Sequence, residues 1–155
     1  MREVELLVIG GGPAGLSATA EAAGMGASVL LVDSGPRLGG QLIKQTHKFF
    51  GSRDEFAGTR GFRIADVLLD ELKGLSDRVE AMIDTTVVGY YREDGTVSLS
   101  RSEDEYFLVK PKRIVVAAGA QERLLPFPGN DLPGVYGAGA VQTLMNVYGV
   151  VPGKK

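Results

Sequence analysis

The sequence lacks cysteine and tryptophan among its 155 residues, and it has a single histidine. Without cysteine the chain can form neither a disulfide nor a redox-active thiol pair, and it offers no cysteine ligand to an iron–sulfur cluster. The lack of cysteine also fits a cytoplasmic location, which we therefore expect. Its apolar runs fall short of the roughly 18 residues needed to cross a membrane, and we expect no signal peptide, because the first apolar run reads as a strand.

No charge of one sign dominates either. The 17 lysines and arginines nearly balance the 19 aspartates and glutamates, which leaves a net charge of −2 and no basic patch. Nucleic acid is therefore not an expected partner, and with one histidine and no cysteine we expect no metal site. Hydrophobic residues make up 44% of the chain, so we expect a single globular domain over residues 1–155.

The first 33 residues hold the most informative pattern. An apolar run at residues 4–9 has the length of a buried parallel strand, and GGGPAG follows at 10–15. An alanine-rich helical stretch at 14–26 leads into a second apolar run at 28–32, which ends on Asp33. Strand, glycine turn, helix, strand and acid in this order are typical of a dinucleotide-binding unit. The alternative is a strand–helix–strand unit whose glycines only make a tight turn.

Each position of the glycine motif has a physical role. Gly10 permits the turn out of the strand, Gly12 lets the backbone approach a pyrophosphate, and Gly15 lets the helix pack on the sheet. Pro13 and Ala14 lie in the first helical turn, where proline's missing N–H has no cost. The free N–H groups and the positive dipole end of that turn would face the phosphate charge.

Asp33 lies 18 residues after Gly15, close to the spacing of about 20 expected for an acid that binds ribose hydroxyls. Its charge would repel a 2′-phosphate, so NADP is not expected. Ser34 begins the loop that follows. This loop ends in two glycines, Gly39 and Gly40, and Gln41 comes directly after them. We interpret these residues as a second cofactor contact, because glycine lets the backbone pass close to a ligand and glutamine can both donate and accept. The alternative is a flexible surface loop.

His47 is the candidate catalytic residue. It lies in QTHKFF, a polar cluster followed by two phenylalanines. An imidazole there could act as an acid or base or contact the substrate. The alternative is a histidine that caps or bridges an irregular segment.

The rest of the chain predicts further helices and strands. Residues 61–75 place apolar side chains at spacings of three and four, which indicates a helix facing the core. We predict a β-meander over residues 79–110, from short strands at 79–83, 85–91, 97–101 and 106–109. Residues 113–118 form another buried strand, which ends in small residues, Ala118 and then Gly119, as expected where a ligand crosses strand ends. A helix follows at 137–148.

Taken together, these motifs resemble the N-terminal FAD-binding part of the pyridine nucleotide–disulfide oxidoreductase superfamily. The resemblance rests on GGGPAG with Asp33, on LGGQL at 38–42 and on RIVVAAGAQERLLPFPG at 113–129. The stretch at 133–155 is similar to the flavin subunits of opine oxidase, of proline and sarcosine dehydrogenases and of hydrogen cyanide synthase. The resemblance implies an α/β, Rossmann-like FAD-binding fold of three layers, with a parallel sheet and a β-meander.

The resemblance also implies roles for particular residues. The three motif glycines would hold the pyrophosphate of FAD, and the acid at 33 would bind the adenosine ribose. Gly40 and Gln41 would lie along the cofactor. Val87 would meet the adenine, and Ala118 and Gly119 would pass by the cofactor.

Two departures from the family pattern limit the expected function. Disulfide reductases of the superfamily carry a cysteine pair just after the two glycines, where this chain has Gln41 and Leu42, so disulfide chemistry is excluded. Family chains also continue with a second glycine-rich unit for NAD(P) and then return to the FAD domain. We therefore expect a partial FAD domain, truncated at its C-terminal end: an expressed fragment, a truncated gene product or one piece of a split enzyme.

The resemblance thus implies the FAD-binding portion of a flavin-dependent oxidoreductase. The substrate would be a small amine or amino acid that gives a hydride to the flavin, and other subunits or the rest of a longer chain would carry the electrons away. One alternative is a non-catalytic nucleotide-binding subunit or fragment that needs a partner chain. Another is a module that binds NAD, which is also the cofactor expected for the missing domain.

Overall fold

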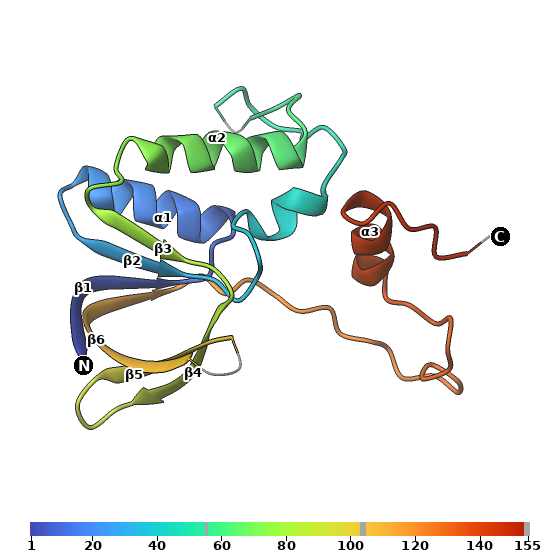
Figure 1. Ribbon diagram of the computed structural model, residues 1–155. Helices are drawn as coiled ribbons and strands as arrows, with labels where there is room; N and C mark the ends of the chain where they lie inside the picture. Colours follow the sequence, from blue (N-terminus) through green and yellow to red (C-terminus); the bar gives the residue numbers. More distant parts are fainter. Residues whose placement is uncertain (55, 103–104, 154–155) are drawn as a thin grey trace.

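The computed structural model describes residues 1–54, 56–102 and 105–153, so the last two residues of the expected domain lie outside it. Its strands form one six-stranded sheet in the order β3-β2-β1-β6-β5-β4. Figure 1 shows helices α1 and α2 above the sheet and α3 apart from it. In chain order the elements are β1 (Arg2–Ile9), α1 (Pro13–Gly24), β2 (Val29–Val32), the 3₁₀ helix η1 (Gly40–Lys44), α2 (Gly61–Lys73), β3 (Val79–Met82), β4 (Thr85–Tyr91), β5 (Thr96–Arg101), β6 (Glu105–Val116) and α3 (Ala138–Asn146).

Four strands form the parallel part of the sheet. β1 pairs in parallel with β2 on one side and with β6 on the other, and β2 pairs in parallel with β3. All four residues of β2 are buried, because the strand has a neighbour on each side and is covered on both faces. The βαβ unit predicted from the first 33 residues is therefore confirmed.

Alternate residues of β2 enter two separate cores. Val29 and Leu31 pack with α1 and α2 on the helical face of the sheet. Leu30 and Val32 pack on the opposite face, together with buried residues of β5 and β6. This division follows from the two-residue period of a strand, and it produces the three layers that the resemblance implied: helices, parallel sheet and meander.

The meander is built from fewer strands than the sequence suggested. β4 and β5 pair antiparallel, as do β5 and β6, whereas β3 pairs in parallel with β2. Residues 79–82 therefore belong to the parallel part, and the antiparallel meander begins at β4. The reason is that a strand's sequence does not reveal on which sheet edge the strand pairs.

A second difference concerns β6, which was expected as two strands, 106–109 and 113–118. It is one strand that pairs with β5 up to Val109 and with β1 as far as Val116. Pro111 lies between the two expected strands, and proline has no N–H for a ladder. Beyond Val109, however, the edge of β6 that faced β5 has no partner strand among the described residues, and such an edge tolerates proline.

The last part of the chain leaves the sheet. We call residues 1–116 the body and residues 117–153 the arm. The arm runs away from the end of β6 and returns to place α3 beside η1 (Figure 1). Two hydrogen bonds at Lys44 join α3 to the body, one from its ammonium to Thr143 Oγ1 (3.3 Å) and one to its carbonyl from Asn146 Nδ2 (2.7 Å). α3 itself has no buried residue.

Two further findings concern the described ranges as a whole. None of the helices described there is long and apolar enough to cross a membrane. Nor do the described side chains bring together three histidine, aspartate or glutamate residues that could hold a metal ion.

Candidate dinucleotide-binding site

The site lies where three parallel strands end. The N–H of Gly10, just after β1, donates to the carbonyl of Val32 at the end of β2 (2.8 Å). The N–H of Ala117, just after β6, donates to the carbonyl of Ile9 (2.7 Å). The ends of β1, β2 and β6 are thus held side by side. Ligands of open α/β sheets bind at this carboxyl edge.

Close backbone approaches explain two of the glycines in the loop after β1. Gly10 has a φ of +104°, and a Cβ added there would lie 2.4 Å from the carbonyl oxygen of Ala117. A Cβ on Gly15 would lie 1.8 Å from the carbonyl oxygen of Gly10. Gly10 therefore makes the turn out of β1, and Gly15 lets α1 pack directly on the turn, as the sequence predicted.

The N-terminus of α1 is open toward this edge. Gly12 is the N-cap and supplies no side-chain cap, and Pro13 begins the helix. The first hydrogen bond of the helix runs from the N–H of Leu16 to the carbonyl of Gly12 (2.9 Å). The N–H groups of Ala14 and Gly15 have no acceptor among the described residues. Free amides at the positive end of a helix are the groups that bind phosphate.

Asp33 forms hydrogen bonds with the glycine turn, with its own loop and with the start of β4. The N–H of Gly11 donates to its Oδ2 (2.5 Å), and the N–H of Gly35 donates to its Oδ1 (2.7 Å). Its backbone carbonyl accepts from the N–H of Thr85, the first residue of β4 (2.9 Å). Each carboxylate oxygen can accept more than one hydrogen bond, so these contacts orient Asp33 and leave capacity for ribose hydroxyls.

A cleft of about 220 Å³ adjoins Asp33 and contains many of the predicted residues. Gly10, Asp33, Ser34, Val87 and Ala118 all line it, although they come from four separate parts of the chain. The other lining residues are Ile9, Val32, Thr85 and Thr86. Among these, Thr85 and Thr86 begin the strand that holds Val87.

The loop before η1 packs on the glycine turn. The N–H of Gly39 donates to the carbonyl of Gly11 (2.7 Å), and a Cβ on Gly40 would lie 2.7 Å from the Cα of Gly12. Gly40 thus lies against the glycine turn, and its contact with the cofactor stays a prediction. Gln41 is the second residue of η1 and is exposed. Gly119 lies past the strand end in the arm, with no atom within 4 Å of an added Cβ.

His47 lies elsewhere. It is exposed, does not line the cleft, and stacks on Phe49 with ring centroids 5.1 Å apart. Its carbonyl accepts from the N–H of Gly61 (3.4 Å), and the carbonyl of Gln45 accepts from the N–H of Phe62 (3.2 Å). This segment therefore caps α2 with its backbone, and the catalytic role of His47 stays a prediction.

Comparison with known proteins gives consistent matches. Residues 4–151 match the family described as pyridine nucleotide-disulphide oxidoreductase. The chain is 36% identical to the alpha subunit of sarcosine oxidase from Rhizobium meliloti, covering 97% of this chain and 16% of that one. It is 34% identical to an opine oxidase subunit from Agrobacterium tumefaciens, covering 96% and 30%. L-proline dehydrogenase from P. horikoshii superposes with a TM-score of 0.85 at 27% identity, covering 97% of this chain and 30% of that structure.

The residues present fit the adenosine and pyrophosphate half of FAD. The cleft supplies an oriented carboxylate beside Val87. The open end of α1 lies beside Gly40, where an added Cβ would lie 2.7 Å from the Cα of the N-cap residue, Gly12. The chain spans less than a third of the length of the relatives named above. By sequence and by fold, the chain belongs to the pyridine nucleotide-disulphide oxidoreductase family, and its dinucleotide site is an FAD-binding one.

Proposed function

We propose that this chain holds the adenosine diphosphate half of FAD in an oxidoreductase that oxidises a small amine or amino acid. The observation that carries the binding role is the cleft beside Asp33, which collects predicted residues from four parts of the chain next to free helix amides. The substrate class is supported by the names of the relatives, which refer to sarcosine, opines and L-proline. When bound, FAD would supply the hydride acceptor.

The chain's own residues have binding and orienting roles in this proposal. Asp33 accepts hydrogen bonds from the ribose hydroxyls, and Val87 packs on the adenine. The amides of Ala14 and Gly15 face the pyrophosphate. Two relatives are named as subunits, which supports a further proposal that partner chains or additional polypeptide complete the enzyme. We also propose a cytoplasmic location, in keeping with a sequence that has no cysteine.

Titration of the purified chain with FAD and FMN tests the binding role. FMN lacks the adenosine, so we expect FAD to bind and FMN to bind at least tenfold more weakly. Asp33→Ala should weaken FAD binding by about tenfold or more, because hydrogen bonds to a charged group contribute about 1.5–3 kcal/mol. Calorimetry gives the dissociation constants, and circular dichroism checks that the variant is folded.

Asp70→Ala is the matched control, because Asp70 is an exposed acid on α2 that does not line the cleft. Its affinity for FAD should equal that of the wild type. Failure of the folded wild-type chain to bind FAD, or equal binding of FMN and FAD, would contradict the proposal.

A second candidate function is that of an NAD-binding module. One observation favours it: the cleft and the free amides are placed for adenosine and pyrophosphate, which FAD and NAD share. NAD in the same titration separates the two. Tighter binding of NAD than of FAD would select the second candidate, and the reverse order would select the first.

A further inference from the structure

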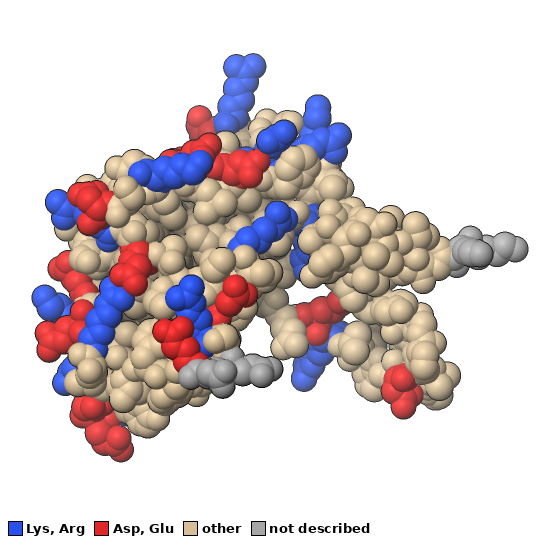
Figure 2. All heavy atoms as spheres, viewed as in Figure 1, with Lys and Arg blue, Asp and Glu red and all other residues tan. Residues whose placement is uncertain are grey.

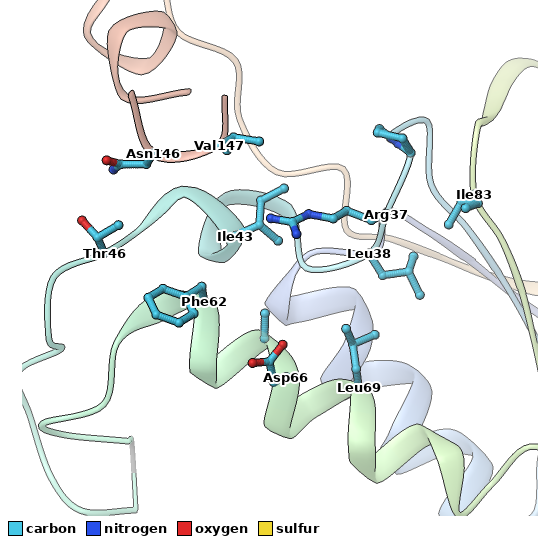
Figure 3. A pocket seen from close by; sticks show the side chains of 12 residues that line it. Arg37, Leu38, Ile43, Thr46, Phe62, Asp66, Leu69, Ile83, Asn146 and Val147 are labelled. Atoms are coloured by element: carbon cyan, nitrogen blue, oxygen red, sulfur yellow. The ribbon is translucent and has the colours of Figure 1, made fainter. Parts of the chain in front are cut away.

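A second, larger cleft lies on the other side of the loop that follows Asp33. Its volume is about 670 Å³, and it shares no lining residue with the adenosine cleft. Its walls come from that loop, from η1, from α2 and from the end of α3 (Figure 3). The two clefts are therefore distinct sites.

Most of the lining of this cleft is apolar. Leu38 and Ile43 come from the loop and η1, Phe62 and Leu69 come from α2, and Val147 follows α3. Volumes of 300–1,000 Å³ and largely apolar walls with a few polar groups are typical of small-molecule sites. The lining thus suits a ligand with an apolar body.

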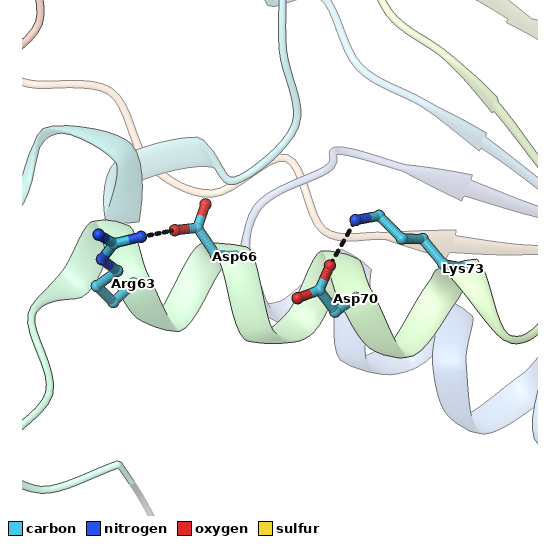
Figure 4. A network of polar contacts seen from close by, with 4 residues as sticks. All are labelled: Arg63, Asp66, Asp70 and Lys73. Carbon is cyan, nitrogen blue, oxygen red and sulfur yellow. Dashed lines mark hydrogen bonds and ion pairs between the residues drawn. The ribbon is translucent and has the colours of Figure 1, made fainter.

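Two opposite charges face into the cleft. Figure 3 shows the guanidinium of Arg37 extending into it from the loop and the carboxylate of Asp66 extending into it from α2. Arg37 forms no ion pair within the described ranges. Asp66 accepts from Arg63 Nη1 through Oδ2 (3.2 Å), while its Oδ1 has no hydrogen-bond partner among the same residues (Figure 4). Each charged group can therefore bind a ligand.

We propose that this cleft binds an apolar amino acid in its zwitterionic form. The carboxylate of the ligand would pair with Arg37, its ammonium would pair with Asp66, and its side chain or ring would lie on the apolar lining. The ligand class rests in part on the proposed function, whereas the place of binding rests on the cleft alone.

The position of Leu38 links the two clefts. Leu38 lines the larger cleft, and its Cδ2 lies 2.3 Å from where a Cβ on Gly11 would be, so it contacts the glycine loop. The N–H of Gly11 is in turn bonded to Asp33. An amino acid resting on Leu38 should therefore change nucleotide affinity, and a nucleotide should change amino-acid affinity by the same factor.

The test uses three compounds with a five-membered ring that carry different charged groups. L-Proline carries both charges, pyrrolidine only the positive one and cyclopentanecarboxylate only the negative one. NMR titration of the 155-residue chain at pH 7 should show saturable shifts with L-proline around residues 37–43 and 62–69. Binding of the other two rings should be several-fold weaker, because each leaves one protein charge without a partner.

Charge-removing variants complete the experiment. Arg37→Gln and Asp66→Asn should each weaken L-proline binding by about threefold to tenfold, since both charges are partly exposed. Asp70→Asn is the matched control: it also removes an ion pair of α2, with Lys73 (Figure 4), but Asp70 does not line the cleft. Both test residues lie on the surface, so the variants should remain folded.

The proposal is overturned if millimolar L-proline, at up to a 100-fold excess over the chain, gives no saturable changes in chemical shift. It is also overturned if Arg37→Gln and Asp66→Asn bind L-proline as well as Asp70→Asn does. The FAD titration is independent of these measurements. Loss of FAD binding with L-proline binding intact refutes only the proposed function, and the opposite pattern refutes only this inference.

Discussion

The body and the arm both contain many apolar residues, but they use them differently. Every buried hydrophobic residue of the described chain lies in the body. In the arm, Leu125 is 76% exposed, Val151 is 77% exposed and Phe127 is 52% exposed. The two regions also differ in charge. Figure 2 shows lysine, arginine, aspartate and glutamate spread over the body, whereas the arm is mostly uncharged.

The difference teaches that apolar sequence alone does not make a core. The apolar residues of the body alternate or recur with the period of a strand or helix, so they reach a shared interior from several elements. Many of those in the arm lie near prolines and glycines outside any helix or strand, and α3, the helix of the arm, has no buried residue. Leucine, glycine and glutamate occur in both regions, so a body residue can be compared with an arm residue of the same type.

The largest change in the free energy of unfolding is expected when a leucine is replaced. Leu31 in β2 is fully buried, so Leu31→Ala should lower the free energy of unfolding by about 2–5 kcal/mol through lost burial and a cavity. Leu125→Ala should change it by less than about 0.5 kcal/mol, because the side chain is exposed. Urea unfolding followed by circular dichroism measures both. Similar losses in the two variants would show that the arm is part of the cooperative core.

Glycine should give the next largest effect. Gly15→Ala places a methyl group against the backbone oxygen of Gly10 and should cost about 1–3 kcal/mol. Gly139, near the start of α3, would meet only the Glu122 side chain, with Oε2 3.0 Å from the added Cβ. Gly139→Ala should therefore leave the unfolding free energy within about 0.5 kcal/mol of the wild type. The same urea experiment measures both unfolding free energies. If Gly15→Ala left the unfolding free energy unchanged, this would contradict the tight packing of α1 on the glycine turn.

The smallest effect is expected for glutamate, and it depends on pH. The Arg2 guanidinium donates to Glu80 across the body's sheet, and this hydrogen bond lowers the pKa of Glu80 below its ordinary value. The bond thus adds stability above the unfolded-state pKa of about 4.3, and this stability is lost as the pH falls through the lower folded-state pKa. Because both side chains are about half exposed, Glu80→Gln should cost only about 0.5 kcal/mol at pH 7.

Glu122 is the arm counterpart of Glu80. Its Oε2 accepts from the N–H of Gly139 at the start of α3. Glu122→Gln should leave the unfolding free energy unchanged at every pH. Thermal unfolding of both glutamate variants between pH 3 and 7 provides the measurement. A Glu80→Gln deficit that persists at pH 3 would show that the loss does not arise from charge.

Much of the fold could be predicted from the sequence, because local patterns report local structure. The glycine spacing and the apolar runs located β1, α1 and β2, and the three-and-four spacing located α2. The pairing of β3 and the continuity of β6 could not be read in this way. Both depend on which strand lies alongside, and a short apolar run carries no information about its neighbour.

The candidate site, too, has a part that could be predicted from the sequence and a part that could not. The positions of Gly10, Gly15 and Asp33 at the carboxyl edge of the sheet could be predicted, because a glycine turn and an acid at fixed spacings mark such an edge. The hydrogen bonds of Asp33 to Gly11 and Gly35 could not, since they depend on how two loops meet. Nor could the larger cleft, in which Arg37 and Asp66 are 29 positions apart in the sequence and come from a loop and a helix.

The sequence by itself thus determined the chemical types and the order of the elements: a glycine turn after the first strand, an acid after the second, and apolar faces with helix and strand periods. These are properties of short segments, and each is encoded within a few residues of the chain. Only the tertiary structure decided which face of each strand is covered, where the meander meets Asp33, and that the arm leaves the sheet at Val116. Those outcomes depend on contacts between distant segments, whose free energy is set by packing and burial rather than by local preference.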